Sequence, residues 1–290
     1  MVLQLLRTRL PLKAVRSFVT NIRPEMPGKT LDEVVSQLES FAPTKNAEKW
    51  DNVGLLIEPH TPRKIQKIFL TNDLTEPVMT EALKKQADMI ISYHPPIFAP
   101  LKRISQKNWK ERIVSICLEN RIALYSPHTS WDFAKGGVGD WLASSLPHLE
   151  SCPIQINPEC NWGIGRLLTL KGGVSLKDAI ERVKMTTNIA DVRVSIGKDS
   201  NLDSIITTVA VCPGSGGSLF RGVQANLYLT GEMSHHEVLD AAQNNISVIL
   251  CNHSNSERGY LKHFKSILED LLGNIVVVVS ENDADPLQTY

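Results

Sequence analysis

The 290-residue sequence lacks several features that mark whole classes of protein. Lysine plus arginine and aspartate plus glutamate both number 31, so no net charge favours nucleic acid or an anionic membrane surface. The longest apolar run, 275–279, falls far short of the roughly 18 residues that span a membrane. We therefore expect neither a membrane protein nor direct nucleic-acid binding.

Cysteine is also used sparingly. The five cysteines are an odd number, widely spread, and no two form a Cys-x-x-Cys pair. This argues against a disulfide framework and against a thiolate zinc site, and it indicates a reducing compartment. The sequence has no short-period repeat and no low-complexity segment.

What the sequence does contain is an alternation of strand and helix patterns, which predicts a layered α/β fold. A Thr-Leu-Asp-Glu capping box at Thr30 opens the first helix, and a Ser-His-His-Glu box at Ser234 opens a later one. The proline-containing stretch 146–162 is predicted to be a connector. Short apolar runs predict strands at 50–57, 67–71, 88–92, 122–125, 167–170, 191–196, 205–212, 226–230, 246–251 and 275–279.

This pattern divides the chain into three parts. Residues 1–27 form a basic extension with no acid before Glu25 and interleaved leucines, which is typical of a mitochondrial presequence; a disordered basic tail is the alternative. Residues 28–145 plus 246–290 are predicted to form a first α/β lobe, and 146–245 a second. The predicted location is mitochondrial, cytoplasmic or both, with the nucleus as a further candidate.

Histidines follow four predicted strands at the point where each strand ends. They are His94, His128, the adjacent pair His235–His236, and His253. Strand ends in α/β sheets can converge even when they are distant in sequence.

A carboxylate stands four residues after His128 and four residues after His253. His128 precedes Asp132 and His253 precedes Glu257, an offset that places both side chains on one side of a helical turn. Imidazole and carboxylate without thiolate suit zinc, manganese, iron or nickel, and two such ions would favour a hydrolase. A surface ion pair is the alternative for each pair. His235 and His236 could orient ligands, cap a helix or pack.

Several of these motifs, in this order, resemble the NIF-three-like family, which is named for an interaction with a transcriptional co-activator and is also labelled GTP cyclohydrolase type 2. The motifs are Trp-Asp-Asn-Val-Gly-Leu, Ser-Tyr-His-Pro-Pro-Ile-Phe, His-Thr-Ser-Trp-Asp, Gly-Glu-Met-Ser-His-His-Glu and Asn-His-Ser-Asn-Ser-Glu, within residues 28–290. The resemblance implies a two-lobed α/β fold with a dinuclear metal centre in the cleft between the lobes. It also implies a homo-oligomer, either a dimer or a ring-shaped hexamer built from dimers.

Carried over by motif, the resemblance implies His94, Asp132, His253 and Glu257 as metal ligands. Glu257 would bridge two ions and His128 would lie beside them. One position departs from the family pattern, because Tyr93 stands where bacterial members have a second histidine. Tyrosine is a poor ligand unless its pKa, near 10, is strongly lowered, so the chain is expected to hold one or two ions.

Two functions follow from these observations. The first is a metal-dependent hydrolase acting on a nucleotide-like or other small substrate, with His128 as the candidate proton carrier. The second is a non-catalytic scaffold or transcription-linked regulatory protein that retains the metal cleft and binds a protein partner. A catalytic thiol at Cys251, two residues from His253, is a more distant third.

Overall fold

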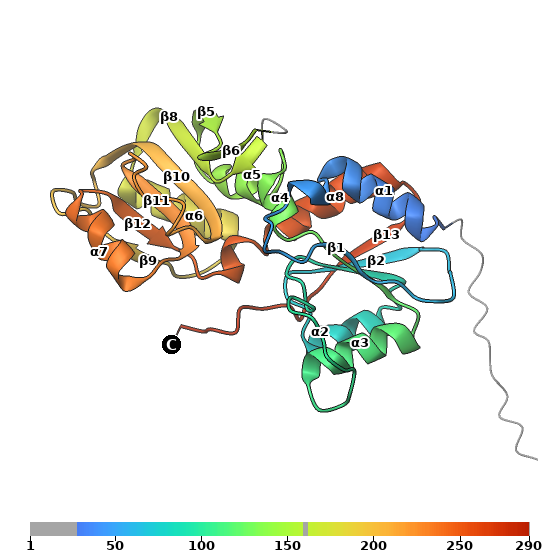
Figure 1. Cartoon of the computed structure of the whole chain (residues 1–290). Helices are drawn as coiled ribbons and strands as arrows, with labels where there is room; N and C mark the ends of the chain where they lie inside the picture. The colour runs from blue at the N-terminus through green and yellow to red at the C-terminus, as the bar shows by residue number, and fades with distance from the viewer. Residues whose placement is uncertain (1–27, 159–161, 290) are drawn as a thin grey trace, which may run out of the picture.

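The computed structural model describes residues 28–158 and 162–289, which form a mixed α/β protein built on two main sheets (Figure 1). The five-stranded sheet has the order β1-β4-β3-β2-β13, and the six-stranded sheet has the order β5-β8-β10-β11-β12-β9. The predicted α/β class is therefore confirmed. The basic extension predicted over residues 1–27 lies outside the described residues.

In the five-stranded sheet four strands run parallel and β1 pairs antiparallel to β4 at one edge. Successive side chains of its central strands are all buried: Met89 and Ile91 face one core, and Ile90 faces another. Parallel strands covered by helices on both faces need such continuous apolar runs. The strands are β1 (Gly54–Ile57), β2 (Lys67–Thr71), β3 (Met89–Ser92), β4 (Ala123–Ser126) and β13 (Val276–Val279).

Helices cover both faces of this sheet (Figure 1). On one face lie α1 (Leu31–Phe41) and α8 (Tyr260–Leu272), and on the other lie α2 (Glu76–Lys84) and α3 (Trp109–Glu119). The predicted capping box between Thr30 and Glu33 is present. Within the part of the chain that the structure describes, no helix has both the length and the apolar character needed to cross a membrane.

In the six-stranded sheet β10, β11 and β12 run parallel, with antiparallel strands toward both edges. One face of this sheet packs against α6 (Leu176–Thr187), and the other packs against α7 (His235–Gln243). The strands are β5 (His148–Cys152), β8 (Arg166–Ser175), β9 (Arg193–Ser195), β10 (Ile205–Ser215), β11 (Leu227–Glu232) and β12 (Ser247–Leu250).

Three short helical segments lie where the sheets adjoin. Helix α5 (Val138–Ala143) touches both main cores, because Val138 packs with the first and Leu142 with the second. Helix α4 (Thr129–Phe133) follows β4, and the 3-10 helix η2 (Ser254–Ser256) follows β12. A second 3-10 helix, η1 (Thr44–Asn46), follows α1.

The prediction of a connector over 146–162 is wrong. That stretch contains β5 and β6 (Gln155–Asn157), and β7 begins at Trp162 and runs to Ile164. These short strands are largely exposed and their prolines lie at strand boundaries, so they carry little of the apolar pattern that marks a buried strand. The division into two lobes stays a prediction. Strand β12, which that prediction assigns to the first lobe because the lobe resumes at residue 246, pairs with β11 of the six-stranded sheet, and the chain returns to the five-stranded sheet after Leu250.

Candidate metal centre

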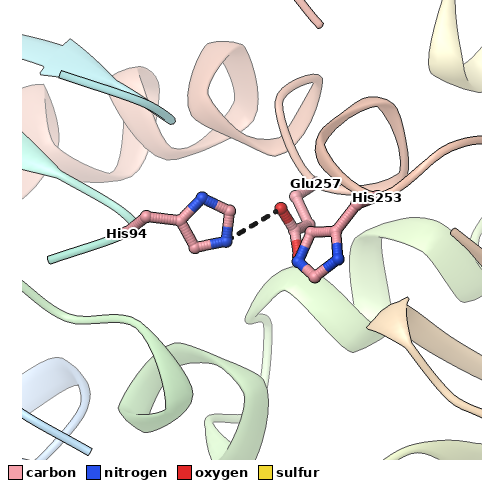
Figure 2. A group of neighbouring side chains, drawn as sticks. All are labelled: His94, His253 and Glu257. Carbon is pink, nitrogen blue, oxygen red and sulfur yellow. Dashed lines mark ion pairs between the residues drawn. The ribbon is translucent and has the colours of Figure 1, made fainter. Parts of the chain in front are cut away.

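His94, His253 and Glu257 come together from distant parts of the chain. One ligand atom from each lies within 4.8 Å of the others. The Nε2 atom of His94 lies 3.4 Å from one oxygen of Glu257, and the Nε2 atom of His253 lies 3.3 Å from the other (Figure 2). The structure thus brings together three of the four residues predicted as ligands.

The two sheets present these side chains from their strand ends. His94 lies two residues after β3 of the five-stranded sheet, and His253 lies three residues after β12 of the six-stranded sheet. Asn252 takes a left-handed φ of 65°, which asparagine tolerates, and so turns the chain just before His253. Glu257 directly follows η2, which carries the chain from His253 to Glu257.

Each histidine near this group has a carboxylate on its other ring nitrogen. The Nδ1 atom lies 2.9 Å from Asp73 in His94, and 2.9 Å from Glu232 in His253. In neighbouring His128 the Nδ1 atom lies 2.8 Å from Asp51. An ionised carboxylate only accepts hydrogen bonds, so Nδ1 is the donor in each contact, and in the neutral imidazole Nε2 then carries the lone pair.

The Nε2 atoms of His94 and His253 face the Glu257 carboxylate, which is itself a hydrogen-bond acceptor. With Nδ1 protonated, the Nε2 lone pairs of His94 and His253 both point at Glu257, and such an arrangement needs a cation or a proton between the atoms. Ligands at about 2.1 Å in tetrahedral sites lie about 3.4 Å apart, and each Nε2 atom lies at about this distance from a different oxygen of Glu257. Three protein ligands also leave a coordination position open, as catalytic sites do.

The Glu257 carboxyl is buried, with a side chain only 3% exposed. Burial raises its pKa well above the usual range, and the nearby Asp132 carboxylate raises it further, while a hydrogen bond from Asn72 (3.2 Å) opposes the rise. A buried carboxyl at a cluster of imidazoles is costly to ionise unless a cation neutralises it. The donor set and its surroundings therefore fit a divalent ion.

Gly214, at the end of β10, leaves the space that the group occupies. It has a φ of +66°, and a Cβ atom there would lie 2.6 Å from Glu257 Oε1 and 3.1 Å from His253 Nε2. Any side chain would therefore displace the proposed ligands. Strand β10 continues through Ser215, so Gly214 is held beside the centre by the sheet.

Tyr93 and Asp132 form a pair of their own beside the group. The Tyr93 hydroxyl donates to Asp132 at 2.6 Å. Burial, and then the charges of Asp132 and Glu257, raise the pKa of Tyr93 well above its ordinary value, so its hydroxyl stays protonated and acts as a donor. Among the described residues, the group that fits one ion contains neither of them, and Asp132 as a ligand stays a prediction.

His128 packs against the rings of Tyr93 and His94. Its ring centroid is 5.2 Å from that of His94 and 5.6 Å from that of Tyr93. Its backbone has a φ of 35°, an unusual value for a residue other than glycine, and such strain often accompanies functional positions. Asp51 holds it through Nδ1, and also accepts the hydroxyl and backbone N–H of Thr129.

His235 and His236 lie elsewhere. They open α7, both are exposed, and their rings contact each other at 5.4 Å between centroids. The predicted capping box that encloses them, from Ser234 to Glu237, is present. Within the described chain the group of candidate ligands includes neither histidine.

The sequence interpretation did not single out Asp51, Asp73, Glu232 or Asn72. Asp73 and Glu232 follow predicted strands, so a search for acids at strand ends would have found these two, whereas Asn72 is an amide and Asp51 lies near the start of the predicted strand 50–57. Their partners lie 21 to 185 residues away, which spacing alone does not reveal.

A cavity of about 530 Å³ opens beside the group. His94 and His253 line it, together with Trp109 from α3, Arg193 from β9 and the C-terminal residues 284–287. Ligand pockets commonly have about this volume, so a small molecule fits next to the candidate metal position.

Comparison with known proteins gives consistent matches over nearly the whole chain. The family described as Duf34/NIF3 (NGG1p interacting factor 3) matches residues 29–286. A NIF3-like protein 1 from Drosophila melanogaster is 52% identical over 266 residues, covering 90% of both chains. NGG1-interacting factor 3 from Saccharomyces cerevisiae is 37% identical, covering 89% of this chain and 96% of its own.

Among solved structures, reduced HcgD from Methanocaldococcus jannaschii is similar, with a TM-score of 0.75 and 27% identity over 89% of this chain and all of that one. The family, the relatives and the shared fold agree. This chain belongs to the Duf34/NIF3 family.

Proposed function

We propose that this chain binds a divalent metal ion through His94, His253 and Glu257 and hydrolyses a small substrate in the adjoining cavity. The observation that carries the proposal is the pairing of each imidazole Nδ1 with a carboxylate, which aims both Nε2 atoms at Glu257. Zinc, manganese, iron and nickel all accept this donor set. Glu257 offers one oxygen to each histidine, an arrangement compatible with one ion or with a bridged pair.

The chemistry divides between the ion and the residues around it. A bound divalent ion acts as a Lewis acid that polarises a substrate oxygen and activates water. His128 supplies the proton transfer: Asp51 fixes its Nδ1–H at 2.8 Å, so Nε2 is the atom that accepts or returns a proton. Its side chain is 16% exposed, and its ring lies 5.2 Å from that of His94, which lines the cavity.

A second candidate function rests on a different observation. The yeast relative is named as a factor that interacts with NGG1, and this suggests a protein partner in transcription. Under this alternative the chain is a scaffold in which the metal group stabilises the junction of the two sheets. Assembly into a dimer or hexamer is also a proposal, which sedimentation would test.

A turnover screen of the metal-loaded protein separates the two candidates. We expect hydrolysis of at least one member of a panel of nucleotides, phosphate esters and amides, and a loss of about 10²–10⁴-fold in turnover for His128→Ala with unchanged metal content. His236→Ala is the matched control, since it removes an exposed histidine far from the group. Metal-loaded protein that hydrolyses nothing in the panel would contradict the hydrolase and favour the scaffold.

A further inference from the structure

The C-terminal segment after β13, residues 280–289, runs across the junction between the two sheets. It leaves the five-stranded sheet and extends toward the half of the molecule that holds β9 and α7 (Figure 1). Residues 284–287 line the cavity beside the candidate metal centre, opposite side chains such as Trp109 and Arg193. The segment is therefore a wall of the site, although it has no helix or strand of its own.

Specific contacts hold this segment at both ends. At its start the Glu81 carboxylate accepts the Ser280 hydroxyl at 2.7 Å and the backbone N–H groups of Glu281 and Asn282 at 3.0 and 3.1 Å. Farther along, the Ser254 hydroxyl of η2 donates to Asp285 at 2.9 Å. A chain end fastened in this way is an ordered part of the structure.

Asp283 is the buried residue of the segment, with a side chain only 2% exposed. One carboxylate oxygen accepts the backbone N–H of Asn72 at 2.6 Å, and the other forms an ion pair with Arg258 Nε at 3.2 Å. A buried charge that is paired in this way stabilises its partners' positions, and removing it takes away the nearer of the two carboxylates that face Arg258.

Both partners of Asp283 lead directly to the candidate ligands. The Asn72 side chain donates to Glu257 at 3.2 Å. Arg258 also lies 3.7 Å from Asp73, whose other oxygen accepts the Nδ1–H of His94 at 2.9 Å. Asp283 thus reaches two of the three ligands through one or two intermediate residues.

We propose that Asp283 is a positioning residue for the metal group, and that the C-terminal segment is a functional part of the site. The inference rests on the proposed metal binding by His94, His253 and Glu257. Outer partners of metal ligands fix ligand orientation, and their loss typically weakens metal affinity about 10–100-fold. Asp283 contacts those outer partners rather than the ligands themselves, so its loss should weaken metal affinity less.

The test compares the metal affinity of full-length Asp283→Asn with that of the wild type, measured by competition with a chelator using Zn²⁺ or Mn²⁺. We expect binding weaker by about three- to tenfold. Glu281→Gln is the matched control: it removes an acid two residues away whose side chain is 78% exposed and lies 3.8 Å from Lys85, and its affinity should equal the wild type's.

A second readout distinguishes positioning from general stability. In the metal-free protein the NMR signal of the His94 Nδ1–H should shift or broaden in Asp283→Asn and stay unchanged in Glu281→Gln. Should Asp283→Asn fail to fold, full-length Asp283→Glu serves in its place, because it keeps the charge but moves the carboxylate by one methylene group. Wild-type affinity in a variant that is merely less stable would overturn the positioning role, whereas a wild type that binds no metal at this group would overturn the proposed function itself.

Discussion

The pairs His128–Asp132 and His253–Glu257 share a four-residue spacing, and the structure gives them different roles. His253 and Glu257 face each other at 3.3 Å and are joined by His94 from the other sheet. Asp132 instead accepts the Tyr93 hydroxyl, and its partner His128 is held by Asp51. The four-residue spacing places a carboxylate near an imidazole in both pairs. A third side chain then decides whether the pair faces a metal position: His94 reaches Glu257, whereas Tyr93 reaches Asp132.

The largest expected effect breaks the first pair. Glu257→Gln keeps the shape of the side chain but removes the negative charge that both Nε2 atoms face, so metal affinity should fall by more than about 100-fold, the upper end of the effect of outer partners. Asp132→Asn, the same change in the second pair, should have a smaller effect. Chelator competition measures both, and equal losses would contradict the distinction between the pairs.

The next expected effect comes from adding a histidine beside the second pair, as His94 stands beside the first. Tyr93→His replaces a hydroxyl that donates to Asp132 by an imidazole that can share an ion with it, so the ions bound per chain should rise by one. Tyr93→Phe is the control, because it removes the hydroxyl without adding a ligand. Elemental analysis of purified protein measures the count, and identical counts in the two variants would argue against the role given to Tyr93.

A third effect concerns the Asp51–His128 contact. Burial raises the Asp51 pKa, but hydrogen bonds from His128 and Thr129 lower it more, and the result lies below the ordinary 3.8. A carboxylate with a lowered folded-state pKa contributes stability above its unfolded pKa, and that contribution is lost as pH falls through the folded value. Wild type should be more stable than Asp51→Asn by about 1–3 kcal/mol at pH 7.

That difference should begin to shrink as the pH falls below about 4, where Asp51 of the unfolded chain binds a proton, and it should be lost as the pH passes the lower pKa of the folded state. Urea unfolding at a series of pH values measures it. A difference that stays constant down to pH 2.5 would mean that the carboxylate charge does not matter there.

The smallest expected effect comes from the histidines outside both pairs. His235→Ala and His236→Ala remove exposed rings at the start of α7, so each should change the free energy of unfolding by no more than about 0.5 kcal/mol and leave metal affinity unchanged. Thermal unfolding and chelator competition check this. A loss of metal in either variant would show that the site extends farther than the described group.

The sequence predicted the fold class and the strand ends that carry the site, because apolar runs and capping boxes are local signals. The box at Ser234 and the strand before His94 are examples. It predicted the pairing of His253 with Glu257 for the same reason, since both lie in one turn. The contacts of Asp73 with His94 and of Tyr93 with Asp132 depend on packing between strands, so no spacing in the sequence encodes them.

Anomalous diffraction from crystals soaked in Zn²⁺ or Mn²⁺ would locate a bound ion. We expect a peak bonded to the Nε2 atoms of His94 and His253 and to Glu257, at about 2.0–2.2 Å. A peak confined to His128 and Asp132, or no peak near either pair, would contradict this expectation.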